Sequence, residues 1–473
     1  MHQTWKHQEN GILFALKNDG CCALFWEMGT GKTFTALKIF GELRKKTLGL
    51  KMLVVCPISL IYGAWGCDIQ QFSDYSFCDL HKKFTDKEHD IYIVNFDSFV
   101  SQQRISALKE LLRGGEWLAV LDESSRIKNF SATTTKNILL IKNLFRYRIV
   151  MSGTPAPNDE TEYWPQISFI RDKVFHPKFY PFRSYYFHRQ RERRGKIEYF
   201  SGKITSRDAA REMYSQGWHW AMTDAKRKEM MARIAPYCNY AWKKNCLDLP
   251  EQIDETRIIE MGAEQRKAYN SMKNDLVVEL ENSFVVATVA LTKIMKLRQI
   301  TSSFAIDDAG QNKDIGEKTK LKELQNVLEE AGKQQVIIWC EFRHELAEIL
   351  KLLGGNAVTL YGETKDRDES ITMFKNGTMQ YLIAHGKSAG FGLTFINCNL
   401  QIFYSLNYSW ETYIQCKSRT HRAGQINKCT YIHLLAKDSI DMEIFKVLQN
   451  KGNAQEIIYK IIGRLKSENN TNK

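Results

Sequence analysis

Short apolar runs alternate with longer amphipathic stretches along most of this 473-residue chain. Such runs, each four to six residues long, occupy positions 21–26, 51–56, 91–95, 117–121 and 147–151. Short strands separated by helical segments are typical of parallel βαβ units, whose sheet is covered by helices on both faces. The first third of the chain is therefore predicted to form a parallel α/β sheet.

The same alternation returns in the second half of the chain. Helices are predicted over 264–269, 290–304 and 318–330, and an amphipathic helix after residue 437. Strands are predicted over 335–339, 357–360, 381–384, 400–404 and 429–435. These runs predict a second parallel sheet. It has no phosphate-binding loop of its own, so the two sheets are expected to share one nucleotide.

A glycine-rich turn joins the first apolar run to a helical pattern over residues 32–46. Gly29 and Gly31, which flank Thr30, would let the backbone wrap around an anion. The N-terminus of the helix would turn its N–H groups and partial positive charge toward that anion. A strict phosphate-loop pattern has a further glycine where Trp26 stands, so this stretch alone also fits an ordinary strand, turn and helix.

Lys32 and Thr33 add the chemistry of a nucleotide site to this turn. Lys32 would reach the β- and γ-phosphates of ATP, and the Thr33 hydroxyl would hold Mg²⁺. Upstream, Gln8 could recognise the adenine edge, because an amide offers both a donor and an acceptor. A glutamine that faces solvent is the alternative.

Two acids follow the fourth apolar run directly. The carboxyl ends of parallel strands are where chemistry gathers in such sheets, and the 152–154 segment also follows a strand. Asp122 could hold Mg²⁺ through water, while Glu123 could orient and deprotonate the water that attacks the γ-phosphate. An acidic helix N-cap is the alternative, but a phosphate loop upstream favours catalysis.

Composition and charge narrow the class of protein. The chain is 43% apolar and 26% charged, which is ordinary for a globular protein, and its net charge is +13. A basic balance favours a polyanionic partner, nucleic acid before membrane. There is no long apolar run, no secretory signal and no Cys-x-x-Cys pair among eleven cysteines. A cytoplasmic protein without disulfides or a zinc ribbon is expected.

Much of the positive charge lies in one segment. Residues 171–228 hold fifteen Lys and Arg against six Asp and Glu. Basic residues interleaved with aromatic ones suit a nucleic-acid backbone, and the aromatic rings could stack on bases. A solvated basic face over a small aromatic core is the alternative. The candidate contacts are Arg189, Arg191, Arg193 and Arg194.

Taken in order, these motifs resemble the Swi/Snf-type ATPases of helicase superfamily two. Residues 27–33 resemble the family's Asp-Glu-Met-Gly-x-Gly-Lys-Thr, which also lacks the early glycine. Residues 122–129 resemble Asp-Glu-Ala-His-Arg-Ile-Lys-Asn, and residues 152–158 resemble Gly-Thr-Pro-x-x-Asn. Gln8 falls where the family has its glutamine motif. The resemblance covers nearly the whole chain.

The second half carries two further motifs of this family. Residues 388–393 resemble Gly-Gly-x-Gly-Leu-Asn, and residues 415–425 resemble Gln-x-x-x-Arg-x-x-Arg-x-Gly-Gln. The resemblance implies that Arg419 and Arg422 meet the charge on the γ-phosphate, a task suited to planar guanidinium groups. A basic helix face is the alternative, because i and i+3 lie together. The family also implies nucleotide contacts at Gly392 and Gln425, and nucleic-acid contacts at Pro57, Ser59 and Ser388.

Two departures from the family pattern stand out. Ser124 and Ser125 replace the usual Ala-His, so the histidine that helps to couple nucleotide state to the next motif is missing. His385 and Gly386 stand where relatives place Ser or Thr near the nucleic-acid track. Hydrolysis is expected to survive, whereas coupling and backbone grip are the properties that these departures affect.

The expected fold is α/β, with two RecA-like parallel-sheet lobes, an ATP cleft between them and helical insertions. We expect a first lobe over residues 1–157, a helical basic and aromatic protrusion with an inter-lobe bridge over 158–250, a second lobe over 251–466 and a polar tail over 467–473. The expected activity is that of an ATP- and Mg²⁺-dependent motor that translocates on duplex or branched DNA, as compact bacterial and phage members would. An RNA-stimulated ATPase and a non-hydrolysing nucleic-acid scaffold are the alternatives.

Overall fold

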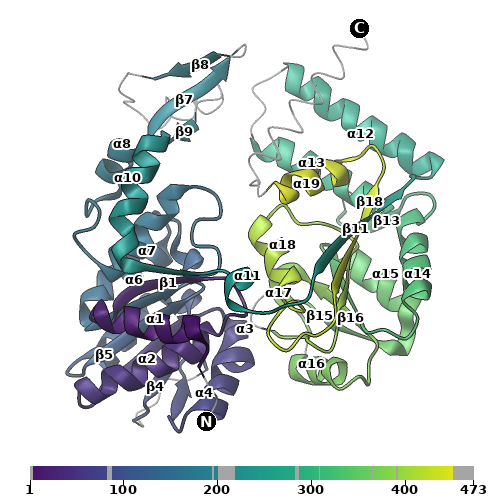
Figure 1. Ribbon diagram of the computed structural model, residues 1–473. Helices are drawn as coiled ribbons and strands as arrows, with labels where there is room; N and C mark the ends of the chain where they lie inside the picture. The colour runs from purple at the N-terminus through teal and green to yellow at the C-terminus, as the bar shows by residue number, and fades with distance from the viewer. Residues whose placement is uncertain are drawn as a thin grey trace. The chain divides into compact units, whose positions relative to one another are not determined.

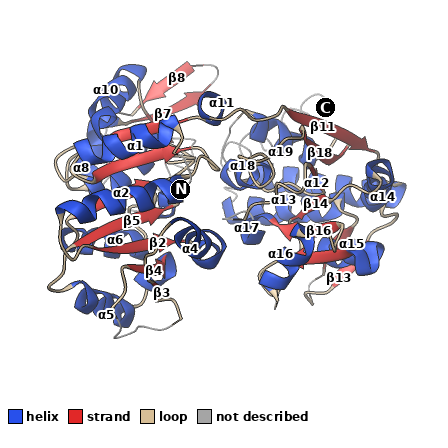
Figure 2. Ribbon diagram, turned by 60° about the horizontal axis from the view of Figure 1, so that its bottom comes forward, coloured by secondary structure: helices blue, strands red, loops and turns tan. Residues whose placement is uncertain are grey.

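The structure is a computed structural model, and it divides the chain into two compact units, Met1–Cys246 and Leu247–Lys473. Each unit is built on one parallel sheet with helices on both faces (Figure 1; strands in red in Figure 2). The α/β class predicted from the sequence is confirmed. The residues described are 4–82, 88–193, 196–200, 219–282, 287–307, 309–364, 366–389 and 393–450.

The sheet of the first unit has seven strands in the order β10-β1-β6-β5-β2-β4-β3, all parallel. All five predicted strands are confirmed, each to within one residue, and β3 and β10 are additions. The strands are β1 (Cys21–Trp26), β2 (Lys51–Cys56), β3 (Phe77–Asp79), β4 (Ile91–Asn95), β5 (Trp117–Asp122), β6 (Tyr147–Met151) and β10 (Cys238–Ala241).

Alternation along these strands divides the first core into two layers. Ala23 and Phe25 of β1 pack on one side with helices α5, α6 and α7, while Leu24 and Trp26 pack on the other side with α1, α2 and α4. Successive side chains of a strand point to opposite faces, so a continuous apolar run is what a sheet covered on both sides requires. The helices are α1 (Lys6–Lys17), α2 (Lys32–Lys46), α4 (Cys67–Phe72), α5 (Gln102–Leu112), α6 (Thr133–Ile141) and α7 (Tyr163–Ile170).

The predicted protrusion is more than helical. Figure 1 shows a small sheet at the end of α8 and α10, beyond the seven-stranded sheet. Its strands are antiparallel in the order β8-β7-β9. The next strand, β10, returns to the main sheet beside β1, so this part of the chain completes the first unit. The elements are α8 (Phe179–Tyr186), β7 (His188–Arg193), β8 (Lys196–Tyr199), β9 (His219–Ala221) and α10 (Asp224–Ile234).

The sheet of the second unit has six parallel strands in the order β11-β18-β17-β14-β16-β15. The five predicted strands are confirmed with shifts of one residue at some ends, and β11 is an addition. The strands are β11 (Gln252–Ile259), β14 (Val336–Cys340), β15 (Ala357–Leu360), β16 (Tyr381–His385), β17 (Leu400–Phe403) and β18 (Cys429–Ala436).

Helices also cover both faces of this second sheet. Ile337 and Trp339 of β14 pack with α13, α16, α18 and α19, while Val336 and Ile338 pack with α14 and α15. The helices are α12 (Ala263–Asn282), α13 (Ala287–Thr301), α14 (Thr319–Ala331), α15 (Arg343–Leu353), α16 (Arg367–Lys375), α17 (Gly386–Ala389), α18 (Trp410–Lys417) and α19 (Ile440–Gln449).

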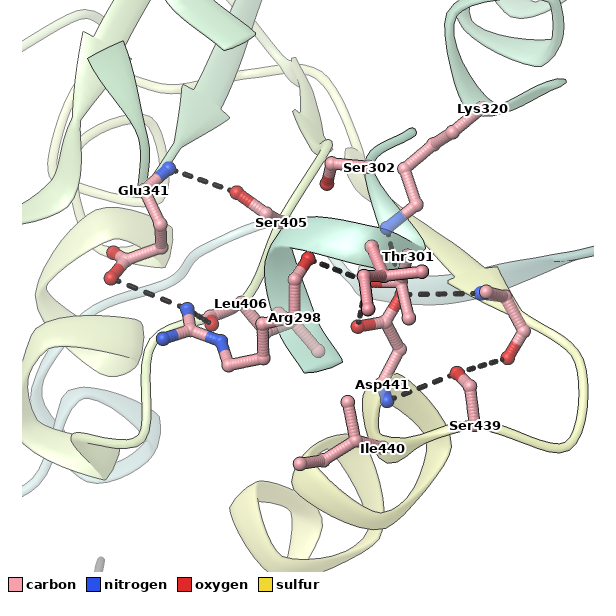
Figure 3. Close-up of polar contacts among 12 residues, drawn as sticks. Arg298, Thr301, Ser302, Lys320, Glu341, Ser405, Leu406, Ser439, Ile440 and Asp441 are labelled. Atoms are coloured by element: carbon pink, nitrogen blue, oxygen red, sulfur yellow. Dashed lines mark hydrogen bonds and ion pairs between the residues drawn. The ribbon is translucent and has the colours of Figure 1, made fainter. Parts of the chain in front are cut away.

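A buried polar network ties three of these helices together (Figure 3). Lys320 of α14 is 1% exposed, and its Nζ lies 2.7 Å from Asp441 of α19. The Thr301 hydroxyl donates to the same carboxylate over 3.0 Å, and Arg298 of α13 donates to the carbonyl of Leu406. A charge removed from water needs such partners. The insertion helix α13 is thereby fixed to the second sheet.

None of the described helices is long and apolar enough to cross a membrane. All eleven cysteines are free thiols.

Candidate nucleotide site

The strand order brings three candidate loops to one edge of the first sheet. Strands β1, β6 and β5 are neighbours in that order, and they run parallel. The phosphate loop (residues 27–33) follows β1, the 152–158 loop follows β6, and the acidic pair ends β5. The three motifs therefore lie together at the carboxyl ends of neighbouring strands, as the sequence predicted.

The phosphate loop depends on two glycines. Gly29 and Gly31 have φ angles of 82° and 80°, in the left-handed region that glycine enters without a steric penalty. A Cβ atom on Gly31 would lie 2.2 Å from Nε2 of Gln8. The Thr30 hydroxyl donates to the carbonyl of Glu27 over 2.8 Å. The loop is thus closed on itself at the start of α2.

Helix α1 holds the phosphate loop from the side. The amide of Gln8 accepts from the backbone of Trp5 over 2.9 Å and donates to the Thr30 carbonyl over 3.3 Å. The ring of His7 also lies 2.8 Å from that carbonyl, through Nε2. Gln8 is buried against the loop, so it links the N-terminal helix to the nucleotide loop, and adenine recognition by it stays a prediction.

Lys32 and Asp122 bring opposite charges together in the buried part of this site. Lys32 Nζ donates to the carbonyls of Trp26 and Glu27 over 3.0 and 3.4 Å. Asp122 accepts from Nε1 of Trp65 over 2.9 Å. Burial raises the pKa of Asp122, and the charge of Lys32 and the bond from Trp65 oppose that rise.

Glu123 has an unusual backbone. Its φ and ψ are 56° and 53°, a left-handed conformation that costs a non-glycine residue energy. Its N–H donates to the Asp122 carboxylate over 3.0 Å, and a short 3₁₀ turn (Ser124–Ile127) follows. Backbone strain of this kind persists only where the surroundings hold it, and it gathers at functional sites.

The 152–158 loop touches the phosphate loop. A Cβ on Gly153 would lie 3.2 Å from Cγ of Met28 and 3.4 Å from the carbonyl of Trp26. At the end of the loop, Asn158 donates its side-chain and backbone N–H groups to the Glu162 carboxylate. The loop is thus packed against the nucleotide loop at one end and pinned by a buried acid at the other.

In the second unit, both candidate arginines are held by the chain around α18. Arg419 is buried and donates to the carbonyls of Gln415 and Leu393, each over 2.8 Å, and to the Ser418 hydroxyl over 3.1 Å. Arg422 donates to the same Leu393 carbonyl over 3.0 Å and is only half-buried. The two side chains are therefore neighbours, as their spacing predicted.

The other predicted residues of the second unit are more internal or lie outside the described residues. The buried amide of Gln425 donates to the carbonyls of Ile396 and Cys398 over 3.2 and 3.0 Å. These bonds brace its own loop, so a nucleotide contact stays a prediction. Gly392 lies outside the described residues, and only the backbone of Ser388, in α17, falls within them.

The candidate nucleic-acid residues of the first unit divide into two groups. Pro57 is buried at the start of a short helical turn, and Ser59 is half-buried. In the protrusion, Arg189 lies over the ring of Trp220, 4.7 Å from its centroid, and Arg191 pairs with Glu198 over 2.6 Å. Both guanidinium groups thus have partners inside the protrusion. Arg194 and the side chain of Arg193 lie outside the described residues.

Four residues of this site carried no signal in the sequence. Trp65 donates to Asp122 from a segment without a recognisable motif, and His7, which contacts the Thr30 carbonyl, belongs to no motif. Glu162 and Gln166 lie on or beside α7, behind the 152–158 loop. Their positions follow from helix packing, which a single sequence does not encode locally.

The fold and this cluster of loops define a P-loop ATPase of the helicase superfamily. Family models agree: the SNF2-related domain matches residues 7–305, and the helicase conserved C-terminal domain matches residues 319–424. The chain belongs to the SNF2-related family, and the family resemblance read from the sequence is confirmed.

Individual relatives are distant but extend along the chain. Putative protein p41 of Acyrthosiphon pisum secondary endosymbiont phage 1 is 23% identical, over 92% of this chain and 94% of its own length. The putative ATP-dependent helicase/translocase YwqA of Bacillus subtilis is also 23% identical, over 94% of this chain but 47% of its own length. The Sulfolobus solfataricus SWI2/SNF2 ATPase core in complex with dsDNA is similar over 98% of this chain and 94% of its own, at 22% identity and a TM-score of 0.43.

Proposed function

We propose that the chain is an ATP-dependent translocase that moves on DNA. One observation carries the proposal: the phosphate loop, the Asp122–Glu123 pair and the 152–158 loop leave adjacent strands at one edge of the first sheet. A phosphate cradle with its lysine, an acid that can hold a metal ion and a second acid that can position water are the parts that phosphoryl transfer to water uses.

Each side chain has a proposed role in hydrolysis. Lys32 binds the phosphates, and Glu123 orients the attacking water and accepts its proton. The Thr33 hydroxyl and the Asp122 carboxylate fit Mg²⁺, which takes oxygen ligands and, when bound, neutralises phosphate charge. Arg422 and Arg419 supply further positive charge to the transferred phosphoryl group.

DNA is the proposed track because the chain is basic and its charge is concentrated in the protrusion. Residues 171–228 supply nine of the thirteen net positive charges, since fifteen basic residues there face six acidic ones. A phosphate backbone is the polyanion that such a surface suits. The Bacillus relative carries the name helicase/translocase. A motor that consumes ATP and acts on DNA would work inside the cell.

The test is ATP turnover with different polymers. We expect duplex or forked DNA to stimulate turnover strongly over the chain alone. Single-stranded DNA and RNA complete the series. Equal stimulation by RNA would overturn the DNA assignment, and no turnover with any polymer would favour a non-hydrolysing scaffold.

The assigned base can be tested by Glu123→Gln, which preserves size and hydrogen-bonding capacity. Turnover should fall by about a thousandfold or more while ATP binding persists, because the amide cannot take a proton from water. Binding is measured with a fluorescent ATP analogue. Unchanged turnover would exclude Glu123 as the base.

A further inference from the structure

We propose that Gln166 is a positioning residue for ATP hydrolysis. Through its side-chain amide, it joins the acidic pair to the 152–158 loop and so fixes Glu123 relative to the phosphate loop. This inference rests on the proposed function, because it assigns to Gln166 an effect on the hydrolysis that Glu123 would perform.

The amide of Gln166 makes three hydrogen bonds in the core. Its Oε1 accepts from the Ser124 hydroxyl over 2.6 Å. Its Nε2 donates to the carbonyl of Pro155 over 2.5 Å and to that of Glu162 over 2.9 Å. Gln166 and Ser124 are fully buried. These contacts form the Ser124–Gln166–Pro155 bridge.

One end of the bridge holds a strained backbone. Ser124 directly follows Glu123, whose φ is 56°. A left-handed non-glycine residue keeps its conformation only when neighbouring groups fix it. The Glu123 N–H donates to the Asp122 carboxylate and so fixes one side of this residue, and the Ser124 hydroxyl, which donates to Gln166, fixes the other. The direction of the Glu123 side chain therefore depends on Gln166.

The other end of the bridge reaches the phosphate loop. Pro155 lies two residues after Gly153, where an added Cβ would lie 3.2 Å from Cγ of Met28 and 3.4 Å from the carbonyl of Trp26. That same carbonyl accepts from Lys32 over 3.0 Å. A chain of packed and hydrogen-bonded groups thus runs from Lys32, through the 152–158 loop and Gln166, to Glu123.

The chemistry of the bridge requires an amide. One end needs an acceptor for the Ser124 hydroxyl, and the other needs a donor for the Pro155 carbonyl. An uncharged side chain that offers both and reaches both ends from α7 is glutamine. An apolar residue of equal volume would fill the space but leave two buried polar groups unpaired. In the family pattern, Ala-His follows the acidic pair. Ser124 stands in place of the Ala and supplies the hydroxyl that the bridge requires.

The experiment compares Gln166→Met, Ser124→Ala and the double variant of the full chain with saturating duplex DNA. Each single variant should lower kcat for ATP by about ten- to a hundredfold through misplacement of Glu123. The KM for ATP and the stoichiometry of a fluorescent ATP analogue should stay within about twofold, because Lys32 and the phosphate loop are untouched. Ser124→Thr, which retains the hydroxyl, should retain most of the turnover.

The double variant tests the bridge itself. If the two residues act as one unit, its kcat should equal that of the weaker single variant rather than the product of both losses. The control is Tyr147→Phe, which removes a buried 2.7 Å hydrogen bond to Thr47 elsewhere in the same unit. It should lower the Tm to a similar extent but leave kcat unchanged.

Three results would overturn the inference. They are wild-type kcat in both single variants, losses that multiply in the double variant, and a fall in kcat for Tyr147→Phe that matches its fall in stability. Each would leave the proposed function standing if the wild-type chain hydrolyses ATP. A wild-type chain that hydrolyses no ATP would overturn the proposed function and this inference together.

Discussion

Arg419 and Arg422 are held to different degrees by their own unit. Arg419 is buried and donates hydrogen bonds to two carbonyls and a hydroxyl. Arg422 is half-buried and donates through Nη1 to the Leu393 carbonyl and the Thr394 hydroxyl. A guanidinium that meets a phosphate outside its own unit must be accessible at the surface of that unit. Because Arg422 is the more exposed of the two, we propose that it contacts the phosphate directly, while Arg419 adds its charge and also holds the Leu393 segment in place.

The two arginines should separate in experiment. Arg422→Ala should lower kcat by about a hundredfold or more with little change in Tm. Arg419→Ala should cost roughly 2–4 kcal/mol of unfolding free energy, because buried carbonyls lose their donors. Turnover and thermal unfolding of both variants, with Arg422→Lys as a charge-retaining comparison, check this. Equal Tm losses would contradict the division of roles.

Glu162 is a buried acid whose titration lies near neutral pH. Burial raises its pKa from 4.5 to about 7, against the opposing hydrogen bonds from Asn158. The native carboxyl therefore keeps its proton over a range in which the unfolded carboxyl has lost it. Stability from this group is complete at low pH and is lost as the pH rises through 7.

Glu162→Gln should remove this pH dependence. Between pH 5 and 7 the wild-type unfolding free energy should fall relative to the variant, by on the order of 3 kcal/mol in total, and run parallel to it above pH 8. Asp122, whose pKa burial also raises, is present in both proteins and cancels. Denaturant unfolding at several pH values measures the difference. Parallel curves from pH 5 to 8 would contradict it.

At the scale of single residues, the sequence predicts which groups take part in the chemistry better than it predicts which residues hold those groups in place. Lys32, Asp122 and Glu123 follow strands in recognisable motifs, so their convergence could be inferred. Gln166 could not, because its partner Ser124 lies 42 positions away and meets it only after α7 packs under the sheet. The burial of Arg419 could not be predicted either, because it also depends on contacts between segments that are distant in the sequence.

Among the elements, the contact between α17 and α18 explains one departure from the family. A Cβ on Gly386 would lie 2.9 Å from Cγ2 of Thr412 and 3.3 Å from Sγ of Cys416. A Cβ here requires the Thr412 side chain or α18 to shift. Glycine at position 386 allows α17 to pack closely against α18, the helix that precedes Arg419. This close packing accounts for a glycine in place of the Ser or Thr of the family pattern.

Gly386→Ser tests this packing. It should cost about 1–3 kcal/mol of unfolding free energy, as other insertions into packed cores do. The control is Gly355→Ser, since a Cβ there meets nothing within 4 Å and its φ is not left-handed. That variant should leave the Tm unchanged or slightly higher. A Gly386→Ser protein as stable as the control would show that the helices adjust freely.

Elements with apolar runs were predictable, and polar ones were not. All ten predicted strands are present, and all except β15, which is mostly half-buried, are mainly buried. Strand β11 is largely exposed along its length, and β7, with the sequence His-Arg-Gln-Arg-Glu-Arg, has no apolar alternation at all. Their pairing with β18 and with β8 and β9 is decided by partners elsewhere in the chain. The three-stranded sheet of the protrusion was therefore not predicted, although α8 and α10 are helical.

At the scale of the whole molecule, DNA binding depends on which basic side chains are not already paired with acidic or aromatic ones. In the protrusion, Arg227 pairs with Glu160 and Asp224, and Lys226 pairs with Glu229. Stacking and ion pairs also engage Arg189 and Arg191. Within the described part of residues 171–228, three exposed lysines form no ion pair, and they are Lys173, Lys178 and Lys228.

These three lysines should carry part of the salt dependence of DNA binding. Each phosphate contact that is lost should lower the slope of log K against log salt by about 0.9 on duplex DNA. The triple Ala variant is measured by fluorescence anisotropy with labelled duplex over a range of NaCl concentrations. The matched control replaces three exposed lysines of the second unit, Lys322, Lys333 and Lys351, and so changes the net charge equally. If both triple variants lose the same affinity and slope, binding reflects net charge alone. If only the protrusion variant loses slope, the protrusion meets the DNA backbone through these side chains.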